Sequence, residues 1–217
     1  MITTSTEHST EPRALHTMLL DRLSEMPRLW MFLRWLVEDG FRGEKDAIER
    51  ELRPWEGLGT RQFLDFGCGT GAFAHCFPKD YYTGFDPATH YISFAGHNRR
   101  GRFAIMAGQS LGFVPRYFDA ALVLGVFHHL PEELCREAAS ELYRVLKPGA
   151  TLLVMEDVYP DWWNIPGHLM HMIDRGKFIR SDADYRALFH PYFTLQKAYH
   201  MRSGICDYGV YVLERNQ

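Results

Sequence analysis

The sequence has 217 residues, a mass of 25.3 kDa, a formal net charge of −3 and an isoelectric point near 6.4. A hydrophobic fraction of 46% beside 24% charged residues is typical of one globular domain with a sizeable core. The acidic balance gives no electrostatic support for a nucleic-acid partner, and the small basic cluster at residues 97–102 is expected to close a helix.

Cysteine spacing and hydropathy indicate the environment of the chain. No C-x-x-C spacing occurs, so we expect neither a zinc ribbon nor a disulfide framework. The N-terminus lacks a basic segment followed by an apolar one, and the apolar run at residues 29–37 contains Arg34. We therefore expect a cytoplasmic protein without a signal peptide or a transmembrane segment.

The first quarter of the chain predicts a helical extension at residues 13–59. Residues 1–12 are polar and rich in Ser and Thr, and we expect them to be disordered. Apolar residues then recur at helical spacing over residues 14–39, where Pro27 separates two helices and Gly40 ends the second. A shorter helix is expected at residues 44–52.

A core at residues 60–157 alternates short apolar runs with helical stretches. The expected strands are residues 62–66, 81–85, 103–106, 118–124 and 151–157. The expected helices are residues 71–77, 88–98 and 131–146. Strands that alternate with helices of this length predict βαβ units, and therefore a parallel sheet with helices on both faces.

The last third of the chain departs from this alternation. Residues 158–180 form an insertion dense in Trp, Met and His, and Ser181 with Asp184 predicts a capping box at the start of a helix. The apolar segments 192–200 and 207–214 are too close in sequence for a parallel crossover, so they predict an antiparallel hairpin within residues 191–217.

The segment FLDFGCGTGAF, residues 63–73, predicts a ligand-binding loop. Gly67, Gly69 and Gly71 follow a buried strand and let the backbone turn sharply and approach a ligand. No Gly-Lys-Ser/Thr follows, so the loop is not a Walker loop. A dinucleotide motif still fits, because Ala72 completes G-x-G-x-x-A and Asp86 stands where a ribose-binding acid belongs.

Asp65 distinguishes between these ligands. A carboxylate two residues before the first glycine would repel a pyrophosphate at this position. The same carboxylate suits a ligand that carries an ammonium and a sulfonium but no phosphate, as S-adenosylmethionine does. A nicotinamide dehydrogenase stays open as an alternative on the glycine motif alone.

Four motifs together resemble the class I S-adenosylmethionine-dependent methyltransferases of the bacterial small-molecule kind. They are D-x-G-x-G-x-G at residues 65–71, GFDPA at 84–88, YFDAALVLGVFHHL at 117–130 and LYRVLKPGATLLVMED at 142–157. The resemblance implies S-adenosylmethionine as cofactor and one methyltransferase domain over residues 1–217. It also implies a Rossmann-like α/β fold, with a seven-stranded, mostly parallel sheet that ends in the antiparallel hairpin.

The resemblance further implies the cofactor-binding residues. Asp65 would help to hold the ammonium group, Asp86 would accept the ribose hydroxyls, and Pro87 would pack beside the adenine. The family often has an acid near the adenine amine where this chain has Ala107, so Gly108 and Gln109 would serve instead through backbone or amide. The expected cofactor-binding set is Asp65, Gly67, Cys68, Gly69, Gly71, Asp86, Pro87, Gly108, Gln109, Leu124 and Gly125.

The catalytic and acceptor residues are less well marked by the sequence. His128 and His129 follow the strand end where the methyl group should be delivered, and either is a candidate base; alternatively the pair packs and hydrogen-bonds the loop. Within the insertion, Trp163, His168 and His171 are candidates for the acceptor pocket, although such residues also cap cores. We expect no metal, because isolated H-x-x-H spacings are common in helices.

The sequence thus leaves three classes of function. The first is methyl transfer from S-adenosylmethionine to an O, N, S or C nucleophile of a small molecule, with a hydrophobic or aromatic acceptor. The absence of an N/D-P-P-Y/F/W tetrapeptide argues against methylation of DNA bases or glutamine amides. The alternatives are a nicotinamide dehydrogenase and a non-catalytic S-adenosylmethionine-binding protein.

Overall fold

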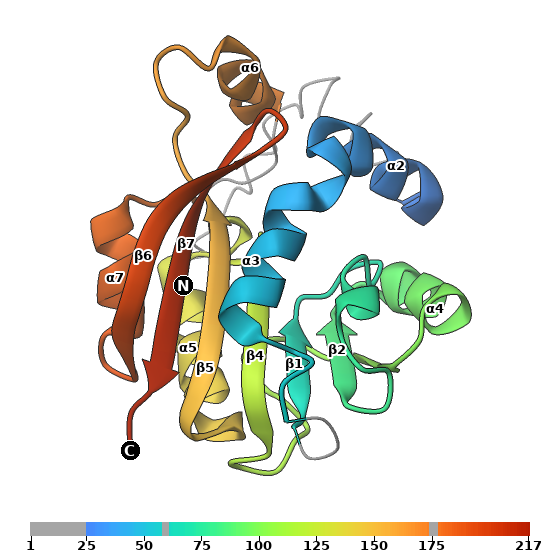
Figure 1. Cartoon of the computed structure of the whole chain (residues 1–217), viewed down its shortest axis with the longest axis vertical. Coiled ribbons are helices and arrows are strands. Elements are labelled where there is room, and N and C mark those ends of the chain that lie inside the picture. The colour runs from blue at the N-terminus through green and yellow to red at the C-terminus, as the bar shows by residue number, and fades with distance from the viewer. Residues whose placement is uncertain (1–24, 58–60, 174–177) are drawn as a thin grey trace, which may run out of the picture.

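A seven-stranded sheet organises the chain, and its strand order is β3-β2-β1-β4-β5-β7-β6 (Figure 1). The computed structural model describes residues 25–57, 61–173 and 178–217. The strands are β1 (Phe63–Phe66), β2 (Tyr82–Asp86), β3 (Arg102–Ile105), β4 (Phe118–Leu124), β5 (Leu146–Asp157), β6 (Phe193–Ser203) and β7 (Cys206–Arg215). Strands β1 to β5 pair in parallel, and β7 is antiparallel to both β5 and β6. The predicted sheet and its terminal hairpin are confirmed.

Helices cover both faces of this sheet, as predicted (Figure 1). The α-helices are α2 (Pro27–Val37), α3 (Arg42–Leu52), α4 (Thr89–Asn98), α5 (Glu132–Val145), α6 (Ile165–Ile173) and α7 (Asp182–Phe189), and the short 3-10 turns are η1 (Asp39–Phe41), η2 (Ala74–Cys76) and η3 (Phe127–His129). Helix α3 and η2 lie on one face, α5 and α7 on the other, and α4 packs on β2 and β3. The predicted helix before Pro27 falls almost entirely outside the described residues.

The central strands β4 and β5 are buried on both faces, which explains their continuous apolar runs. Alternate side chains pack under α5 and α7, as Val123 and Val154 do, while Leu122 and Met155 pack under α3. Burial of each large aliphatic side chain contributes about 1.5 to 3 kcal/mol. The carboxyl ends of these strands are therefore held firmly in place.

The helix predicted at residues 71–77 is wrong. The structure has turns there and only the three-residue η2. Gly71 has a left-handed φ of 65°, and Phe77 takes extended backbone angles because Pro78 follows it. Phe73, Ala74 and Phe77 are still buried between α3 and the sheet, so apolar packing alone produced the helical pattern.

The hairpin is longer than predicted and ends in a tight turn. Strands β6 and β7 reach Ser203 and Cys206, which leaves Gly204 and Ile205 between them. The Ile205 N–H donates to the Val37 carbonyl at the end of α2 (3.1 Å), and the Ile205 carbonyl accepts from the Asn164 side chain just before α6 (3.0 Å). The N-terminal helices and the insertion are thus anchored to one turn above the carboxyl ends of the parallel strands (Figure 1).

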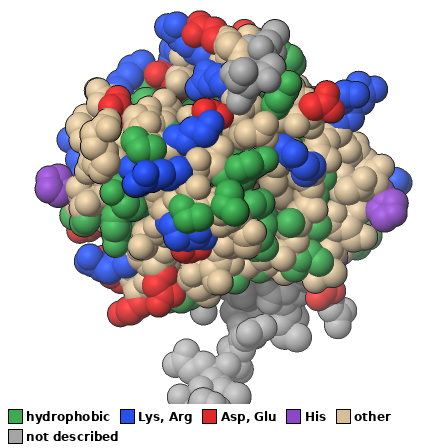
Figure 2. Space-filling model, turned by 90° about the horizontal axis from the view of Figure 1, so that it is seen from below, with side chains coloured by type: hydrophobic (Ala, Val, Ile, Leu, Met, Phe, Trp, Pro, Cys, Tyr) green, Lys and Arg blue, Asp and Glu red, His purple; other side chains and the backbone are tan. Residues whose placement is uncertain are grey.

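At the opposite end of the sheet, the surface carries charges of both signs. Figure 2 views the molecule from below, where the parallel strands begin, and on this face acidic, basic and hydrophobic side chains are interspersed. Within the described residues, no helix has the length and apolar character needed to cross a membrane.

The turn predicts a stability difference between two glycine substitutions. Gly204 and Gly149 both have left-handed φ angles, 59° and 75°. A Cβ at Gly149 would meet nothing within 4 Å, whereas one at Gly204 would lie 2.0 Å from the Val37 carbonyl oxygen. We expect Gly149→Ala to cost about 1 to 2 kcal/mol and Gly204→Ala about 3 kcal/mol or more, measured by urea unfolding. Equal costs would show that α2 is not docked on this turn.

Candidate functional site

The glycine loop after β1 is shaped for close approach of a ligand. Gly67, Gly69 and Gly71 have φ angles of 73°, 51° and 65°, which L side chains rarely adopt. A Cβ at Gly67 would lie 2.6 Å from a methyl group of Val126, so the loop packs directly on the segment that follows β4. A Cβ at Gly69 would meet nothing within 4 Å, so the loop is open at that point.

Asp65 lies beneath this loop with its side chain buried. The Tyr82 hydroxyl donates to its carboxylate at 2.6 Å. Burial raises the pKa of Asp65 to about 7, the Tyr82 hydrogen bond opposes this shift, and the charge of Asp86 adds to it. The carboxyl group therefore changes its charge close to neutral pH.

Asp86 ties the glycine loop to the end of β2. Its carboxylate accepts hydrogen bonds from the backbone N–H groups of Gly69 (3.0 Å) and Ala88 (2.8 Å). Burial raises its pKa, and these two amides partly offset that effect. The Met106 N–H donates to the Asp86 carbonyl at 3.3 Å, which adds the end of β3. The ends of β1, β2 and β3 are thus held together around Asp86.

The other predicted cofactor residues line the same edge of the sheet. Cys68 is buried, and its sulfur would lie 2.8 Å from a Cβ at Gly84, so β2 needs a glycine there. A Cβ at Gly108 would lie 2.5 Å from the Phe66 ring. Pro87 and Gln109 are exposed, whereas Leu124 is buried and Gly125 bonds to β5. The structure therefore brings the predicted set to one edge, at the ends of β1 to β4.

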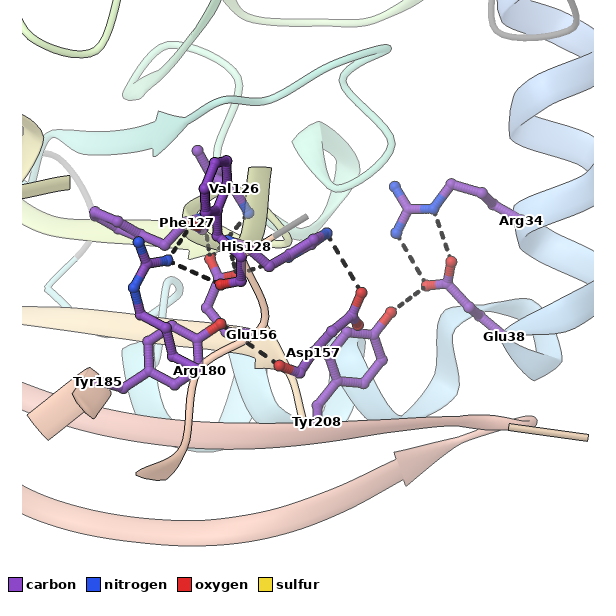
Figure 3. Close-up of polar contacts among 11 residues, drawn as sticks. Arg34, Glu38, Val126, Phe127, His128, Glu156, Asp157, Arg180, Tyr185 and Tyr208 are labelled. Carbon is purple, nitrogen blue, oxygen red and sulfur yellow. Dashed lines mark hydrogen bonds and ion pairs between the residues drawn. The ribbon is translucent and has the colours of Figure 1, made fainter. Parts of the chain in front are cut away.

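A buried carboxylate organises the loop between β4 and α5. Glu156 accepts from the N–H groups of Val126 (2.9 Å), Phe127 (2.8 Å) and His128 (3.2 Å), and from Nδ1 of the His128 ring (2.8 Å) (Figure 3). Burial alone would raise the pKa of Glu156, but His128 and the backbone amides outweigh burial and lower it. Glu156 is therefore ionised and holds three consecutive peptide groups.

His128 is enclosed by carboxylates. Its Nδ1 faces Glu156 and its Nε2 lies 3.4 Å from Asp157, so only the doubly protonated ring can donate to both (Figure 3). His128 is buried, whereas the Asp157 side chain is 20% exposed. His129 is exposed and its ring lies 4.0 Å from that of His128. This geometry favours a packing and hydrogen-bonding role for His128.

The chain returns to the same loop after the insertion. The Phe178 N–H donates to the His128 carbonyl at 3.0 Å. Arg180 donates to the carbonyls of Phe127 (2.7 Å) and Leu130 (2.8 Å), and Figure 3 shows its guanidinium against this loop. The segment that leads into α7 therefore covers the β4–α5 loop.

The residues predicted for the acceptor pocket lie on a different part of the insertion from the segment that covers the β4–α5 loop. Trp163 is half exposed and stacks on Arg202 of β6, with 4.1 Å between the guanidinium and the ring centre. It lines a groove of about 230 Å³ that also includes Tyr159 and Asp207. His168 is exposed on α6, and the side chain of His171 is not described. The described ring contact of Trp163 is with the hairpin and not with the glycine loop.

Several residues that shape this edge were not predicted from the sequence. Glu156 and Asp157 end the run LLVMED, and acids directly after a buried strand are a signal that could have identified them. Tyr82 stands within an apolar run and carries no such signal. Within the described residues, no group of three His, Cys, Asp or Glu side chains is arranged to hold a metal ion.

Comparisons with known proteins agree with this fold. Residues 64–154 match the family model described as a methyltransferase domain. A comparison with curated protein sequences found no match.

Solved structures share the fold at low sequence identity. Magnesium protoporphyrin IX methyltransferase from Synechocystis PCC 6803, solved with bound S-adenosylhomocysteine, has a TM-score of 0.65 and 16% identity, over 85% of this chain and 88% of that one. PH0226 protein from Pyrococcus horikoshii OT3 has a TM-score of 0.62 and 17% identity, over 82% and 92%. An S-adenosylmethionine-dependent methyltransferase from Methanosarcina mazei has a TM-score of 0.55 and 19% identity, over 74% and 95%.

Residues 64–154, which hold the glycine loop, Asp86 and the β4–α5 loop, therefore match a methyltransferase domain, and the chain shares its fold with solved S-adenosylmethionine-dependent methyltransferases. Its methyl donor is S-adenosylmethionine, and its activity is methyl transfer, not the hydride transfer of a dehydrogenase.

The buried Glu156 predicts a pH-dependent stability effect. Glu156→Gln removes the charge and leaves donors of the β4–α5 loop unpaired, so we expect a loss of about 2 to 4 kcal/mol at pH 7 by urea unfolding. Because the folded pKa of Glu156 lies below its ordinary value of 4.5, this stabilisation is present above pH 4.5 and is lost as the pH falls through the folded pKa.

The exposed Glu137 on α5 provides the matched control. Glu137→Gln should change the free energy of unfolding by less than about 0.5 kcal/mol. A Glu156→Gln cost that does not shrink at acid pH would contradict the ionised state assigned to Glu156.

Proposed function

We propose that this methyltransferase transfers the methyl group to a small molecule that binds over the carboxyl ends of β4 and β5. One observation carries the proposal: the glycine loop touches the β4–α5 loop at Gly67 and Val126. Groups suited to the cofactor therefore lie on one side of this contact. His128 and Asp157 lie on the other.

The groups on the first side fit S-adenosylmethionine. The open space at Gly69 admits a ligand against the backbone, and Asp65 and Asp86 supply carboxylates for an ammonium group and for ribose hydroxyls. S-adenosylmethionine supplies an electrophilic methyl group on a sulfonium. We propose Asp65, Asp86 and the backbone of residues 67–69 as its main contacts.

On the side of His128 and Asp157, the main requirement is that the acceptor be aligned with the methyl group. Methyl transfer is an in-line displacement, and well-oriented reactants can recover about 7 to 11 kcal/mol of the barrier. The β4–α5 loop is rigid because Glu156 holds its peptide groups, and the partly exposed Asp157 carboxylate can orient an acceptor N–H or O–H group. We propose that Asp157 orients the acceptor and that His128 holds Asp157 in place.

The surroundings of this edge favour an apolar or aromatic acceptor. Phe32 and Trp35 of α2 are about half exposed, and Tyr159 and Trp163 of the insertion are also exposed. Segments rich in such side chains provide the apolar walls that small-molecule sites need. The same fold serves the magnesium protoporphyrin IX methyltransferase, so it is compatible with an aromatic acceptor.

The size of the acceptor can be tested directly. A cell extract is separated by ultrafiltration, and each fraction is incubated with the protein and S-adenosylmethionine labelled in the methyl group. We expect the label to enter compounds of the filtrate. Label that appears only in the retained protein or nucleic acid would overturn the proposal, although the methyltransferase class would stand.

Asp65 predicts how cofactor affinity depends on pH. The carboxylate binds an ammonium group only when it is ionised, and its pKa is about 7. Affinity for S-adenosylhomocysteine should therefore rise by about tenfold between pH 6 and pH 8, measured by isothermal titration. Because the Tyr82 hydrogen bond lowers this pKa, Tyr82→Phe should move the midpoint to higher pH.

The neighbouring Tyr81→Phe provides the control, because no described hydrogen bond joins the Tyr81 hydroxyl to Asp65. It should leave the midpoint unchanged. An affinity that does not vary with pH in the parent protein would limit Asp65 to a structural role.

A further inference from the structure

The junction between α2 and α3 buries two carboxyl groups that the methyl-transfer site does not use. Glu38 is 3% exposed and Glu44 is 0% exposed. Glu38 accepts from the Arg34 guanidinium at 2.7 and 3.0 Å and from the Tyr208 hydroxyl at 3.1 Å (Figure 3). One guanidinium therefore faces two buried carboxyl groups.

Glu44 lacks the donors that an ionised carboxylate needs. One of its oxygens bonds to the Ser203 hydroxyl, while Oε1 is buried and has no partner within the described residues. Burial, and then the neighbouring Glu38, raise the pKa of Glu44 to about 8. A proton on Glu44 that is donated to Glu38 accounts for the buried oxygen and leaves Arg34 balanced by a single negative charge.

These carboxyl groups lie where α2 and α3 dock on the hairpin turn. The Ser203 hydroxyl also reaches the Glu38 carbonyl (2.9 Å), next to the bond between Ile205 and Val37. A Cβ at Gly43 would lie 3.1 Å from the Arg202 carbonyl oxygen, so the start of α3 packs closely on β6. A second buried negative charge at this position would lie within the contact between the two helices and the hairpin turn.

The remaining charged and titratable groups near Glu44 are few. Burial raises the thiol pKa of Cys206 on β7, and Glu38 and Glu44 lie close enough to raise it further. On the side of α3 that faces η2, Lys45 acts on both His75 and Cys76, while Arg99 also acts on His75 and Asp65 and Glu49 also act on Cys76. Arg34 is therefore the cation that faces the carboxyl pair from the neighbouring elements within the described residues.

Helix α2 connects this junction to the glycine loop. Arg99, at the end of α4, contacts the Met31 sulfur on α2 at 2.6 Å and the Thr70 carbonyl of the loop at 3.5 Å. One end of α2 thus lies against the hairpin turn, and its middle lies beside the residues that hold the glycine loop. Release of α2 would uncover the carboxyl edge of the sheet.

We propose that Glu44 is a proton-dependent positioning residue: its proton, shared with Glu38, keeps α2 and α3 docked over the carboxyl edge. Loss of this proton leaves two adjacent buried carboxylates with one guanidinium. The helices then separate from the hairpin turn, and solvent reaches both carboxylates.

The sign of the pH dependence follows from proton linkage. The docked state binds the Glu44 proton more tightly than the released state, in which the pKa returns toward 4.5. Docking is therefore strongest below pH 4.5 and weakens as the pH rises to about 8, where the effect levels off. Because a single proton is released, the equilibrium constant for docking can change by at most about tenfold per pH unit.

Hydrogen exchange of the parent protein tests this proposal without an acceptor. Protection factors of residues 27–52, corrected for intrinsic exchange rates, are measured by mass spectrometry from pH 5.5 to pH 9. We expect them to fall by up to about tenfold per pH unit until about pH 8, while those of β4 and β5 stay constant. Constant protection of residues 27–52 over this range would overturn the proposal.

Two substitutions separate the Glu44 proton from other titrations. Glu44→Gln keeps a permanent donor toward Glu38, so its protection should stay high at every pH. Glu49→Gln, at an exposed position of α3, should retain the pH dependence of the parent. An unchanged pH dependence in Glu44→Gln would assign the transition to another group. Carboxyl ¹³C chemical shifts of the parent protein give a check independent of any variant, because one buried glutamate should titrate near pH 8.

The effect on catalysis rests on the proposed acceptor site, whereas docking does not. If docking encloses the acceptor, the KM for the acceptor should rise with pH in the parent and stay level in Glu44→Gln. Docking that depends on pH with an unchanged KM would contradict only the acceptor site beneath α2.

Discussion

Two carboxylates, the buried Glu156 and the partly buried Asp86, hold the edge of the sheet where the parallel strands end. Each strand leaves the ladder there, and the backbone N–H groups beyond it need new acceptors. Asp86 accepts two such groups from the glycine loop and the residues after β2, and Glu156 accepts three from the β4–α5 loop. Charged acceptors form stronger hydrogen bonds than neutral ones, so a few acids fix several loops.

At this edge, burial raises the pKa of each carboxyl group, and hydrogen-bond donors oppose burial to different degrees. Glu156 has four donors, which outweigh complete burial and lower its pKa. Asp86 has two amide donors, and burial still prevails. Asp65 and Glu44 each have one described side-chain donor, and their pKa values rise to about 7 and 8. Glu156 therefore stays charged, whereas Asp65 and Glu44 respond to pH.

The sequence predicted most of the sheet because its signals there are local. Apolar runs marked the strands, the short link marked the hairpin, and Ser181 with Asp184 formed the predicted capping box. The helix at residues 71–77 failed because Phe73, Ala74 and Phe77 are buried with helix-like spacing while Pro78 prevents a helix from continuing. The predicted Asp65 and Asp86 stand at strand ends, where position alone indicates a site.

The remaining contacts at this edge depend on residues far apart in the chain. Ser203 meets Glu44 across 159 positions, and Tyr208 meets Glu38 across 170. No pattern in a short window specifies such a pair, because each partner alone is an ordinary Ser, Tyr or Glu. Only the antiparallel return of β6 and β7 beside β5 brings the hairpin turn to the N-terminal helices.

The return of β6 and β7 also connects α2 with the insertion that contains α6, two segments that lie far apart in the sequence. The N–H of Ile205 holds the end of α2, and its carbonyl holds Asn164 before α6. Asn164 is buried and accepts from the Gly167 N–H at 3.0 Å, so the first turn of α6 is fixed through the same side chain. A displacement of the turn therefore acts on α2 and on the insertion together. Any process that releases α2 at Glu44 alters the anchor of α6 as well, and so changes both sides of the edge where the acceptor is proposed to bind.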